Sequence, residues 1–427
     1  MLSHVLSEVE KIKPDQTIVV HSPSYADLIK NTATNFSKTK FVAQEQPLGT
    51  GDALKAATPS LDKGNNVLVL LGDVPLVKAK TLKALKEGIE NADILVLTTT
   101  LEKPTNYGRI KRDEQNKVMA IVEETECNNE EKKINEINSG IIAFSREHLE
   151  ELLSGLDASN KKGEYYLTDT IEMAHNKGLK VDTIITSSSE VFGVNDKKDL
   201  AEAERLKRAE LTKALMEQGV TICDPTRIDI RGTLKCGDDV YIDVNTVFEG
   251  DVELSNGVTV RPFTSISNSY IGENTEIKAY STIDHSKIGN DCIIGPYARL
   301  RPGSDLKNES RVGNFVEIKK STIGERSKVP HLTYVGDTTV GTDSNIGAGT
   351  ITCNYDGANK HNTQIGDNVF IGSGVELVAP VLIEDGATIG AGSTISKSAP
   401  KGKLTFERAK QKTVDGWQRP SKSKDKK

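Results

Sequence analysis

The sequence has few aromatic residues and no long apolar run. Phe, Trp and Tyr together make up 5% of the 427 residues, whereas Gly occurs 35 times. This composition favours stacked aliphatic layers with many turns over a globule built around aromatic side chains. No run of about 18 apolar residues occurs, and no charged leader precedes an apolar segment at the N-terminus. We therefore expect neither membrane insertion nor secretion.

An excess of positive charge is also missing, because the formal net charge is -6 and the pI is near 5.8. Nucleic acid is therefore not expected as a partner. The cysteines occur singly, without a C-x-x-C pair or a His at metal-ligand spacing, which argues against zinc and against a disulfide framework. A reducing cytoplasm is the expected location. These cysteines are Cys127, Cys223, Cys236, Cys292 and Cys353.

The chain is longer than one hydrophobic core usually serves, so two domains are expected. In the first half, short aliphatic runs at 17–20, 66–71, 94–97 and 141–144 alternate with amphipathic segments. This alternation predicts a mainly parallel α/β sheet. Apolar residues at helical spacing then predict a long amphipathic helix from Asp199 to Glu217.

Beyond this helix, Ile-Gly and Val-Gly dipeptides recur at intervals of six or close to its multiples. They begin at positions 271, 288, 294, 312, 323, 335, 340, 346, 365, 371 and 389. This hexapeptide period predicts a parallel β-helix, in which each aliphatic residue stacks on its counterpart one coil away. An ordinary Gly-rich sandwich would instead alternate with period two. Two irregular segments, Arg301–Arg311 and Thr352–Thr363, are expected to protrude as loops and to contribute to a binding site.

Several longer strings carry a resemblance to one known family. In the second half they are GPYARLRPG (295–303), VGNFVEIKKS (312–321), HLTYVGD (331–337) and NIGAGTITCNYDGANKH (345–361). In the first half they are QPLGTGDA (46–53), LGDVPL (71–76), NYGRI (106–110), INSGI (137–141), GEYYLTD (163–169) and FGVN (192–195). Over nearly its whole length the sequence resembles the bifunctional N-acetylglucosamine-1-phosphate uridyltransferase and glucosamine-1-phosphate acetyltransferase family.

The resemblance implies an α/β plus β architecture. A Rossmann-like nucleotidyltransferase domain would be followed by a linker helix, a left-handed parallel β-helix with acetyltransferase activity, and a disordered tail. The expected ranges are 1–197, 198–218, 219–418 and 419–427. The polar, Lys-rich composition of the tail supports its disorder. The family forms homotrimers whose active sites collect residues from neighbouring chains, so a homotrimer is expected.

The implied reaction of the second half transfers an acetyl group from acetyl-CoA to the amine of glucosamine-1-phosphate. The amine must lose a proton, and the resemblance gives the role of general base to His331, a residue type that titrates near neutral pH. A lone His is otherwise more often structural. Arg301 and Lys319 would hold the phosphate, although solvated surface cations are the usual alternative.

Further contacts follow from the same resemblance. Tyr334 and Asn345 would bind the sugar, and Lys360 would add a positive charge. The implied acetyl-CoA-binding residues are small or polar, and each could equally be an ordinary corner of the repeat. They are Ala348, Asn354, Tyr355, Ser373, Ala391 and Arg408.

The implied reaction of the first half is uridylyl transfer from UTP to N-acetylglucosamine-1-phosphate with Mg²⁺, giving UDP-N-acetylglucosamine. Asp73 follows an aliphatic strand, at the strand end where α/β sheets place ligands, and the resemblance makes Asp73 and Asn195 the magnesium ligands. The implied nucleotide-sugar contacts are Gln44, Gly49, Thr50, Leu71, Gly72, Asp73, Gly108, Glu123, Asn138 and Asn195.

The sequence also departs from this family. The family opens with a strand and a Gly-rich loop that cradles the triphosphate, whereas residues 1–9 resemble the helix that follows. Asp52 stands where the family usually has His, and Leu71 where it commonly has an aromatic. We therefore expect impaired uridylyl transfer. Truncation, a misassigned start and natural loss remain open, as does a fully bifunctional enzyme with upstream residues. A non-catalytic scaffold, or a pyrophosphorylase whose β-helix only assembles oligomers, would not require the His, Arg and Lys set.

Overall fold

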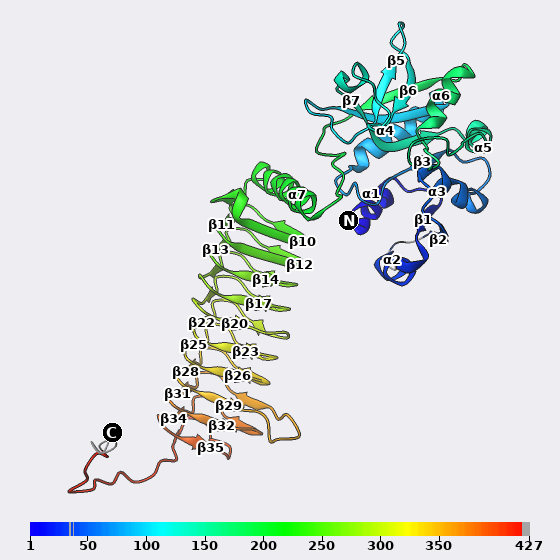
Figure 1. Ribbon diagram of the computed structural model, residues 1–427. Helices are drawn as coiled ribbons and strands as arrows, with labels where there is room; N and C mark the ends of the chain where they lie inside the picture. Colours follow the sequence, from blue (N-terminus) through cyan, green and yellow to red (C-terminus); the bar gives the residue numbers. More distant parts are fainter. Residues whose placement is uncertain (34–35, 37, 421–427) are drawn as a thin grey trace, which may run out of the picture. The chain divides into compact units, whose positions relative to one another are not determined.

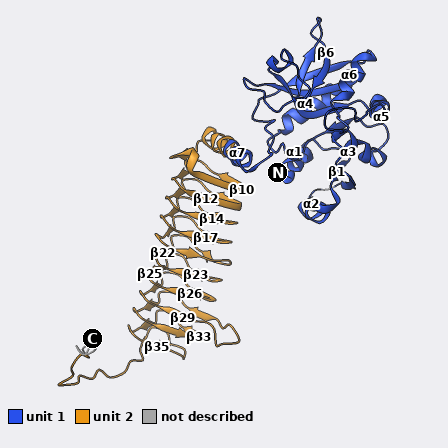
Figure 2. Cartoon of the chain, viewed as in Figure 1, with its two compact units in different colours: residues 1–207 blue, residues 208–427 orange. Residues whose placement is uncertain are grey.

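A computed structural model describes residues 1–33, 36 and 38–420. It divides the chain into two compact units, Met1–Lys207 and Arg208–Lys427 (Figure 2). Helix α7 (Lys197–Glu217) confirms the amphipathic helix expected from Asp199 to Glu217. The domain limits expected from the sequence stay predictions. Most of the predicted disordered tail, 421–427, lies outside the described residues.

In the first unit, α-helices and strands alternate as far as residue 100, and three further strands then follow without an α-helix between them (Figure 1). No helix among the described residues is both long and apolar enough to cross a membrane. The elements are α1 (Leu2–Lys11), β1 (Thr17–His21), α2 (Ala26–Ala33), β2 (Thr39–Ala43), α3 (Thr50–Ala57), β3 (Val67–Val69), α4 (Ala79–Gly88), β4 (Ile94–Thr100), β5 (Arg109–Arg112), β6 (Val118–Val122), β7 (Glu136–Phe144), α5 (Arg146–Ser154), α6 (Asp169–Asn176) and β8 (Val181–Ile185).

Strand β4 is buried on both faces, which explains why its apolar run is continuous. Ile94 and Val96 pack in the cluster that contains Leu149 and Leu152 of α5, whereas Leu95 packs in the cluster that contains helices α1 and α4. Helices therefore cover both faces of the sheet, as in a Rossmann-like domain.

The expectation of a mainly parallel sheet is wrong. The main sheet has the order β6-β5-β7-β4-β8, with β3 also paired to β7. Strand β7 runs antiparallel to β3, β4 and β5, and β5 and β6 are antiparallel to each other. Only β4 with β8, and β1 with β2 in a separate small sheet, are parallel. Residues 113–117 join β5 to β6 in a tight turn, and only antiparallel strands can be joined by so short a connection.

The second unit is a parallel β-helix, and its strands are short because each coil turns after a few residues (Figure 1). They are β9 (Thr221–Ile222), β10 (Ile228–Cys236), β11 (Tyr241–Ile242), β12 (Thr246–Leu254), β13 (Thr259–Val260), β14 (Ser265–Ser267), β15 (Tyr270–Ile271), β16 (Glu276–Ile277), β17 (Thr282–Asp284), β18 (Lys287–Ile288), β19 (Ile293–Ile294), β20 (Arg299–Leu300), β21 (Asp305–Leu306), β22 (Arg311–Asn314), β23 (Glu317–Lys319), β24 (Thr322–Ile323), β25 (Lys328–His331), β26 (Tyr334–Gly336), β27 (Thr338–Val340), β28 (Asn345–Ile346), β29 (Ile351–Cys353), β30 (Thr363–Ile365), β31 (Phe370–Ile371), β32 (Glu376–Val378), β33 (Val381–Ile383), β34 (Thr388–Ile389), β35 (Thr394–Ile395) and β36 (Leu404–Thr405).

Stacked aliphatic side chains form the core of this unit. Ile277 pairs with Ile294 in the next coil, and Ile294 pairs with Val312. All three side chains are fully buried. The hexapeptide period therefore confirms the repeat, because each Ile or Val supplies one rung of a continuous apolar column.

One edge of the β-helix, which we term the first corner column, joins the sheet of β13, β16, β19, β22, β25, β28, β31 and β34 to the face of β14, β17, β20, β23 and β26. Its residues have left-handed φ angles of +48° to +75°. Backbone hydrogen bonds link successive coils along this edge. The column consists of Phe263, Tyr280, Tyr297, Phe315 and Leu332, followed by Gly349, Gly374 and Gly392.

The first five residues of this column, Phe263 to Leu332 in the order given, form an exposed apolar stripe. The rings of Phe263 and Tyr280, and those of Tyr280 and Tyr297, stack with centroids 4.9 Å apart, and Phe315 continues the stack at 5.2 Å. The four rings are 47 to 57% exposed, and Leu332 is 60% exposed. In the coil after Leu332 the column position is occupied by Gly349, and the later members Gly374 and Gly392 are also glycine.

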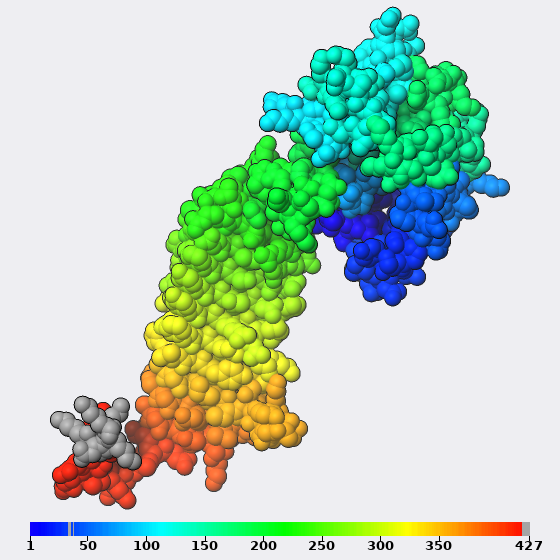
Figure 3. Space-filling model, in the orientation of Figure 1, coloured from blue at the N-terminus to red at the C-terminus, as the bar shows by residue number. Residues whose placement is uncertain are grey.

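Only one of the two predicted loops protrudes. Ile346 pairs with Ile371, an interval much longer than that between Ile277 and Ile294, and the extra residues form the segment 354–361 that stands out from the coil (Figures 1 and 3, orange). The expectation of a loop at Arg301–Arg311 is wrong, because β21 lies within it and the coil keeps its register. Pro302 and Gly303 occupy an ordinary corner there.

Candidate functional site

His331 stands exposed at the end of β25, directly before Leu332 of the first corner column. Its Nδ1 lies 2.6 Å from Oδ1 of Asn314, the residue in register one coil earlier. An amide oxygen can only accept a hydrogen bond, so Nδ1 is the donor, and in the neutral imidazole the lone pair is then on Nε2. The contact with Asn314 therefore orients the imidazole with Nε2 as the nitrogen that can act as a base.

Three of the predicted acetyl-CoA residues occupy the position of His331 in the coils that follow it. Ala348, Ser373 and Ala391 each precede one of the glycines at 349, 374 and 392. Backbone hydrogen bonds join them coil to coil, since Gly374 N donates to Ala348 O and Gly392 N donates to Ser373 O, both at 2.8 Å. Small side chains thus line the edge directly beyond His331.

Arg301, Lys319 and Tyr334 lie on the adjoining face of the β-helix. Lys319 donates to both carboxylate oxygens of Asp337, at 2.8 and 3.1 Å, and Arg301 donates to Glu317 at 2.8 Å. Each carboxylate raises the pKa of its cation, and the Tyr334 phenol lies close enough to contribute to both shifts. Three of the four residues predicted to bind the sugar-phosphate are therefore brought together.

The protruding segment 354–361 is held by polar contacts. Asn354 donates through its side chain to Asp337, and its carbonyl accepts from the His361 amide at 2.8 Å. Tyr355 pairs with Lys360 across the segment, with its ring exposed. The ammonium of Lys319 lowers the pKa of Lys360, so the two amines lie near each other.

Asn345 lies apart from these groups, whereas Arg408 lies beside Gly392, where a Cβ would be 3.9 Å from Arg408 Cδ. Asn345 belongs to β28, on the sheet that precedes the first corner column rather than the face that carries Tyr334. Among the contacts of the described residues, none joins Asn345 to Arg301 or Lys319. Arg408 follows β36, with its guanidinium 5.2 Å from the centre of the Phe406 ring.

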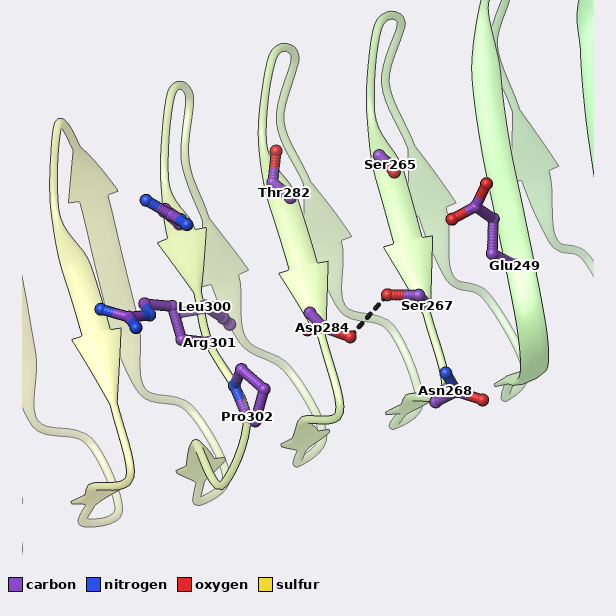
Figure 4. A pocket seen from close by; sticks show the side chains of 10 residues that line it. Glu249, Ser265, Ser267, Asn268, Thr282, Asp284, Leu300, Arg301 and Pro302 are labelled. Carbon is purple, nitrogen blue, oxygen red and sulfur yellow. Dashed lines mark hydrogen bonds between the residues drawn. The ribbon is translucent and has the colours of Figure 1, made fainter.

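A shallow hollow of about 580 Å³ lies on the same face as Arg301 (Figure 4). It mixes acidic, hydroxyl and cationic groups, and Ser267 donates to Asp284 at 2.7 Å within it. His331, Lys319 and Tyr334 are not among the residues that line it. These are Glu249, Ser265, Ser267, Asn268, Thr282, Asp284, Arg299, Leu300, Arg301 and Pro302.

In the first unit, the two predicted magnesium ligands are close in space. Asp73 lies just beyond β3 with an exposed carboxylate. Its carbonyl accepts from the amide of Val194 at 2.9 Å, which brings the adjacent Asn195 beside it. No group of three or more His, Cys, Asp or Glu side chains that could hold a metal occurs in the part of the chain that the structure describes.

Gln44, Gly49 and Thr50 gather at the start of α3. The Gln44 amide donates to Gly49 O at 3.1 Å and to the Asp52 carboxylate at 2.8 Å. Gly49 has a φ of +113°, and a Cβ there would lie 2.6 Å from the carbonyl oxygen of Tyr165, so only glycine fits.

Gly108, Glu123 and Asn138 form a second group. Asn138 N donates to Gly108 O at 2.9 Å, and a Cβ at Gly108 would lie 3.6 Å from the Glu123 carboxyl carbon. Leu71, which precedes Gly72, packs beneath Gly140. Burial raises the pKa of nearby Asp169 to about 6, helped by the negative charges of Asp157 and Glu123.

The sequence reasoning missed three features of the second unit. Asn314 and Asp337 lie inside strings that were recognised as similar to the family, but only a coil register reveals that they contact His331 and Lys319. The change to glycine along the first corner column was also missed. The signal was present, because Gly349, Gly374 and Gly392 each follow a predicted acetyl-CoA residue.

Comparison with known proteins agrees with these two units. Residues 1–190 match the nucleotidyl transferase family, and residues 362–397 match the bacterial transferase hexapeptide (six repeats). The bifunctional protein GlmU of Cupriavidus pinatubonensis is 48% identical over 423 residues, covering 99% of this chain and 93% of the relative. Those of Nitrosomonas eutropha and Ralstonia pickettii are 47% identical over 427 and 425 residues, covering 100% and 99% of this chain and 93% of each relative. The chain therefore belongs to the family of bifunctional GlmU proteins, as the resemblance in its sequence strings led us to expect.

Proposed function

We propose that the second unit transfers the acetyl group of acetyl-CoA to the amine of glucosamine-1-phosphate, with His331 as the general base. The observation that carries this proposal is the hydrogen bond from His331 Nδ1 to Asn314, which leaves Nε2 free to accept a proton. As the amine attacks the thioester carbonyl, its proton passes to Nε2, the C–S bond breaks, and the proton then passes from Nε2 to the departing thiolate, so coenzyme A leaves as the thiol. The product is N-acetylglucosamine-1-phosphate.

Lys319 and Arg301 are proposed to bind the phosphate, with Lys360 adding charge and with Tyr334 and Asn345 contacting the sugar. The carboxylate beside each cation raises its pKa and so keeps it protonated. Phosphate can therefore bind without a protonation step. Arginine offers a planar pair of donors and lysine a point charge, and both are common phosphate ligands.

Acetyl-CoA is proposed to lie along the glycine half of the first corner column. Ala348, Ser373 and Ala391 would flank its pantetheine arm, with Asn354, Tyr355 and Arg408 providing polar contacts. The absence of side chains at Gly349, Gly374 and Gly392 supports this assignment, because the same position carries a ring or a leucine in the five coils before it.

Gly374→Tyr is therefore expected to raise the KM for acetyl-CoA by roughly tenfold or more while the KM for glucosamine-1-phosphate stays near its wild-type value. The variant should fold, since a Cβ at Gly374 meets only the Gly392 nitrogen, at an ordinary contact distance of 4.0 Å, and Tyr280 adopts a similar left-handed φ. Steady-state kinetics with thiol detection measure both constants. A matched Gly402→Tyr variant, at a different corner that is also open, should leave both unchanged. An unaltered acetyl-CoA KM in Gly374→Tyr would place the cofactor elsewhere.

The first unit is proposed to transfer uridylyl from UTP to the acetylated sugar phosphate. The family uses Mg²⁺, and the exposed Asp73 carboxylate beside Asn195 fits an ion that takes one or two protein oxygens and completes its shell with phosphate oxygens and water. When bound, Mg²⁺ would neutralise phosphate charge. Gln44, Gly49, Thr50, Gly72, Gly108, Glu123 and Asn138 are proposed to contact the nucleotide-sugar.

Pyrophosphate release by this chain, supplied with Mg²⁺, UTP and N-acetylglucosamine-1-phosphate, tests the second activity. We expect a rate below that of acetyl transfer, because the Gln44 amide is occupied by Asp52 and a carboxylate beside the triphosphate is repulsive. Acetyl transfer in the same preparation verifies folding. A pyrophosphate rate equal to or above the acetyl rate would overturn the expected impairment and support a fully bifunctional enzyme.

The working assembly is proposed to be a homotrimer in the cytoplasm, where acetyl-CoA and UTP are available. The exposed stripe of Phe263, Tyr280, Tyr297, Phe315 and Leu332 supports association, because stacked aromatics of this kind mark protein interfaces. Asn345 supports it as well, since a residue on the far side of the edge could complete the sugar site of a neighbouring chain.

A further inference from the structure

One buried carboxylate links the cations of the sugar-phosphate site to the protruding segment. Asp337 is at the corner after β26, with a left-handed φ of +49°. The side chains of Lys319 and Asp337 are only 15% and 5% exposed, and no other described ion pair of the second unit is as buried.

Asp337 accepts from two directions. Lys319 Nζ reaches both of its oxygens, and the Asn354 amide donates to Oδ2. Its backbone joins the same two elements, because its amide donates to Lys319 O at 3.0 Å and its carbonyl accepts from Thr363 N at 3.2 Å. Lys319 and the segment 354–361 are thus anchored on one residue.

The charges around this carboxylate are unbalanced. Lys319 and Lys360 face it from two elements, Lys320 is close to Lys360, and the Tyr334 phenol is beside Lys319. Burial alone would raise the pKa of Asp337, but the hydrogen bonds from Lys319 and Asn354 outweigh burial and lower it. Two ammonium groups therefore share one carboxylate, which leaves a net positive charge for a phosphate to neutralise.

We propose that Asp337 is a positioning residue for acetyl transfer: it holds the Lys319 ammonium in place for the sugar phosphate and ties the segment carrying Asn354, Tyr355 and Lys360 to the same point. This inference rests on the proposed function. Without the carboxylate, the largely buried Lys319 ammonium would face the Lys360 ammonium with no opposite charge beside it. It would then turn outward or lose its proton.

Asp337→Asn keeps the shape of the side chain and removes its charge. We expect the KM for glucosamine-1-phosphate to rise at least about tenfold with a much smaller change in kcat. The alkaline decline of kcat/KM for this substrate should also move to lower pH, because Lys319 deprotonates more easily without its carboxylate. A purely structural role would lower the amount of active enzyme and leave the pH profile unmoved.

Asp343→Asn is the matched control. Asp343 also occupies a left-handed corner, and it accepts from Arg326, 17 residues earlier, at 2.7 and 2.9 Å, but this pair is exposed and no described contact joins it to Lys319 or Asp337. It should behave as the wild type. Equal KM values and pH profiles for Asp337→Asn and wild type would overturn the inference, whereas absence of acetyl transfer in the wild type would instead defeat the proposed function.

If Asp337→Asn does not fold, labelling of the lysine amines in the wild type tests whether Asp337 keeps Lys319 charged. Reductive methylation followed by mass spectrometry, carried out across a pH series, gives the labelling midpoint of each lysine. The midpoint for Lys319 should lie above that for Lys360. A Lys319 midpoint at or below that of Lys360 would contradict a carboxylate that keeps Lys319 charged.

Discussion

Replacing His331 by alanine should lower the rate of acetyl transfer by at least about a hundredfold, the usual scale for loss of a general base. The amine would then have to lose its proton to water as it attacks the thioester. The side chain is exposed and its only described side-chain partner is Asn314. Folding and assembly should therefore be unaffected, and the loss should appear in kcat measured by thiol release.

A matched histidine provides the control. His285 is also exposed on the β-helix and also uses Nδ1, which lies 2.6 Å from the Asp284 carboxylate. His285→Ala should retain nearly full acetyl transfer. Asn314→Leu, which removes the oxygen that fixes the tautomer, should cost an intermediate amount, roughly tenfold. Near-normal turnover by His331→Ala would exclude this residue as the base.

The second large effect is expected on the exposed aromatic stripe. Lysine at both Tyr280 and Tyr297 should convert a trimer into monomers and lower acetyl transfer at least about a hundredfold, because charged groups are expensive in the core of an interface. The two rings are stacked at the centre of the stripe and contribute little to the core of their own chain. Light scattering coupled to size-exclusion chromatography gives the assembly, and thiol release gives the activity.

Tyr270→Lys tests whether any exposed tyrosine has this effect. Tyr270 is also exposed on the β-helix, but it lies on β15, outside the first corner column, where its hydroxyl accepts from Ser255 at 3.0 Å. This variant should remain trimeric and active. A Tyr280→Lys, Tyr297→Lys protein that stays trimeric would show that the stripe is not the interface. An active wild-type monomer would refute the assembly itself.

The sequence predicted the second unit better than the first. In the β-helix one short period determines both the strand and its inward residue, so Ile294 or Ile346 could be assigned to the core without any long-range information. In the first unit, an aliphatic run such as Ile141–Phe144 shows that a strand exists but does not show its direction. The antiparallel course of β7 depends on pairings with β3, β4 and β5, which no local pattern contains.

The candidate site divides in the same way. His331, Arg301 and Lys319 could be named because their strings resemble a known family. Their partners could not be, since Asn314, Glu317 and Asp337 come into contact only through a register of 16 to 18 residues. The supposed loop after Arg301 shows the opposite error: a proline and a glycine suggested an interruption, yet they fit a regular corner.

Replacement of bulky residues by glycine along a single edge also restricts how such an active site can change. Successive coils are separated by one strand spacing, about 4.8 Å, so the run of glycines from Gly349 to Gly392 has a length measured in whole coils. A longer or shorter acyl carrier could be matched only in steps of this size, by moving the point at which leucine gives way to glycine. The repeat therefore sets the length of this glycine edge in steps of one coil.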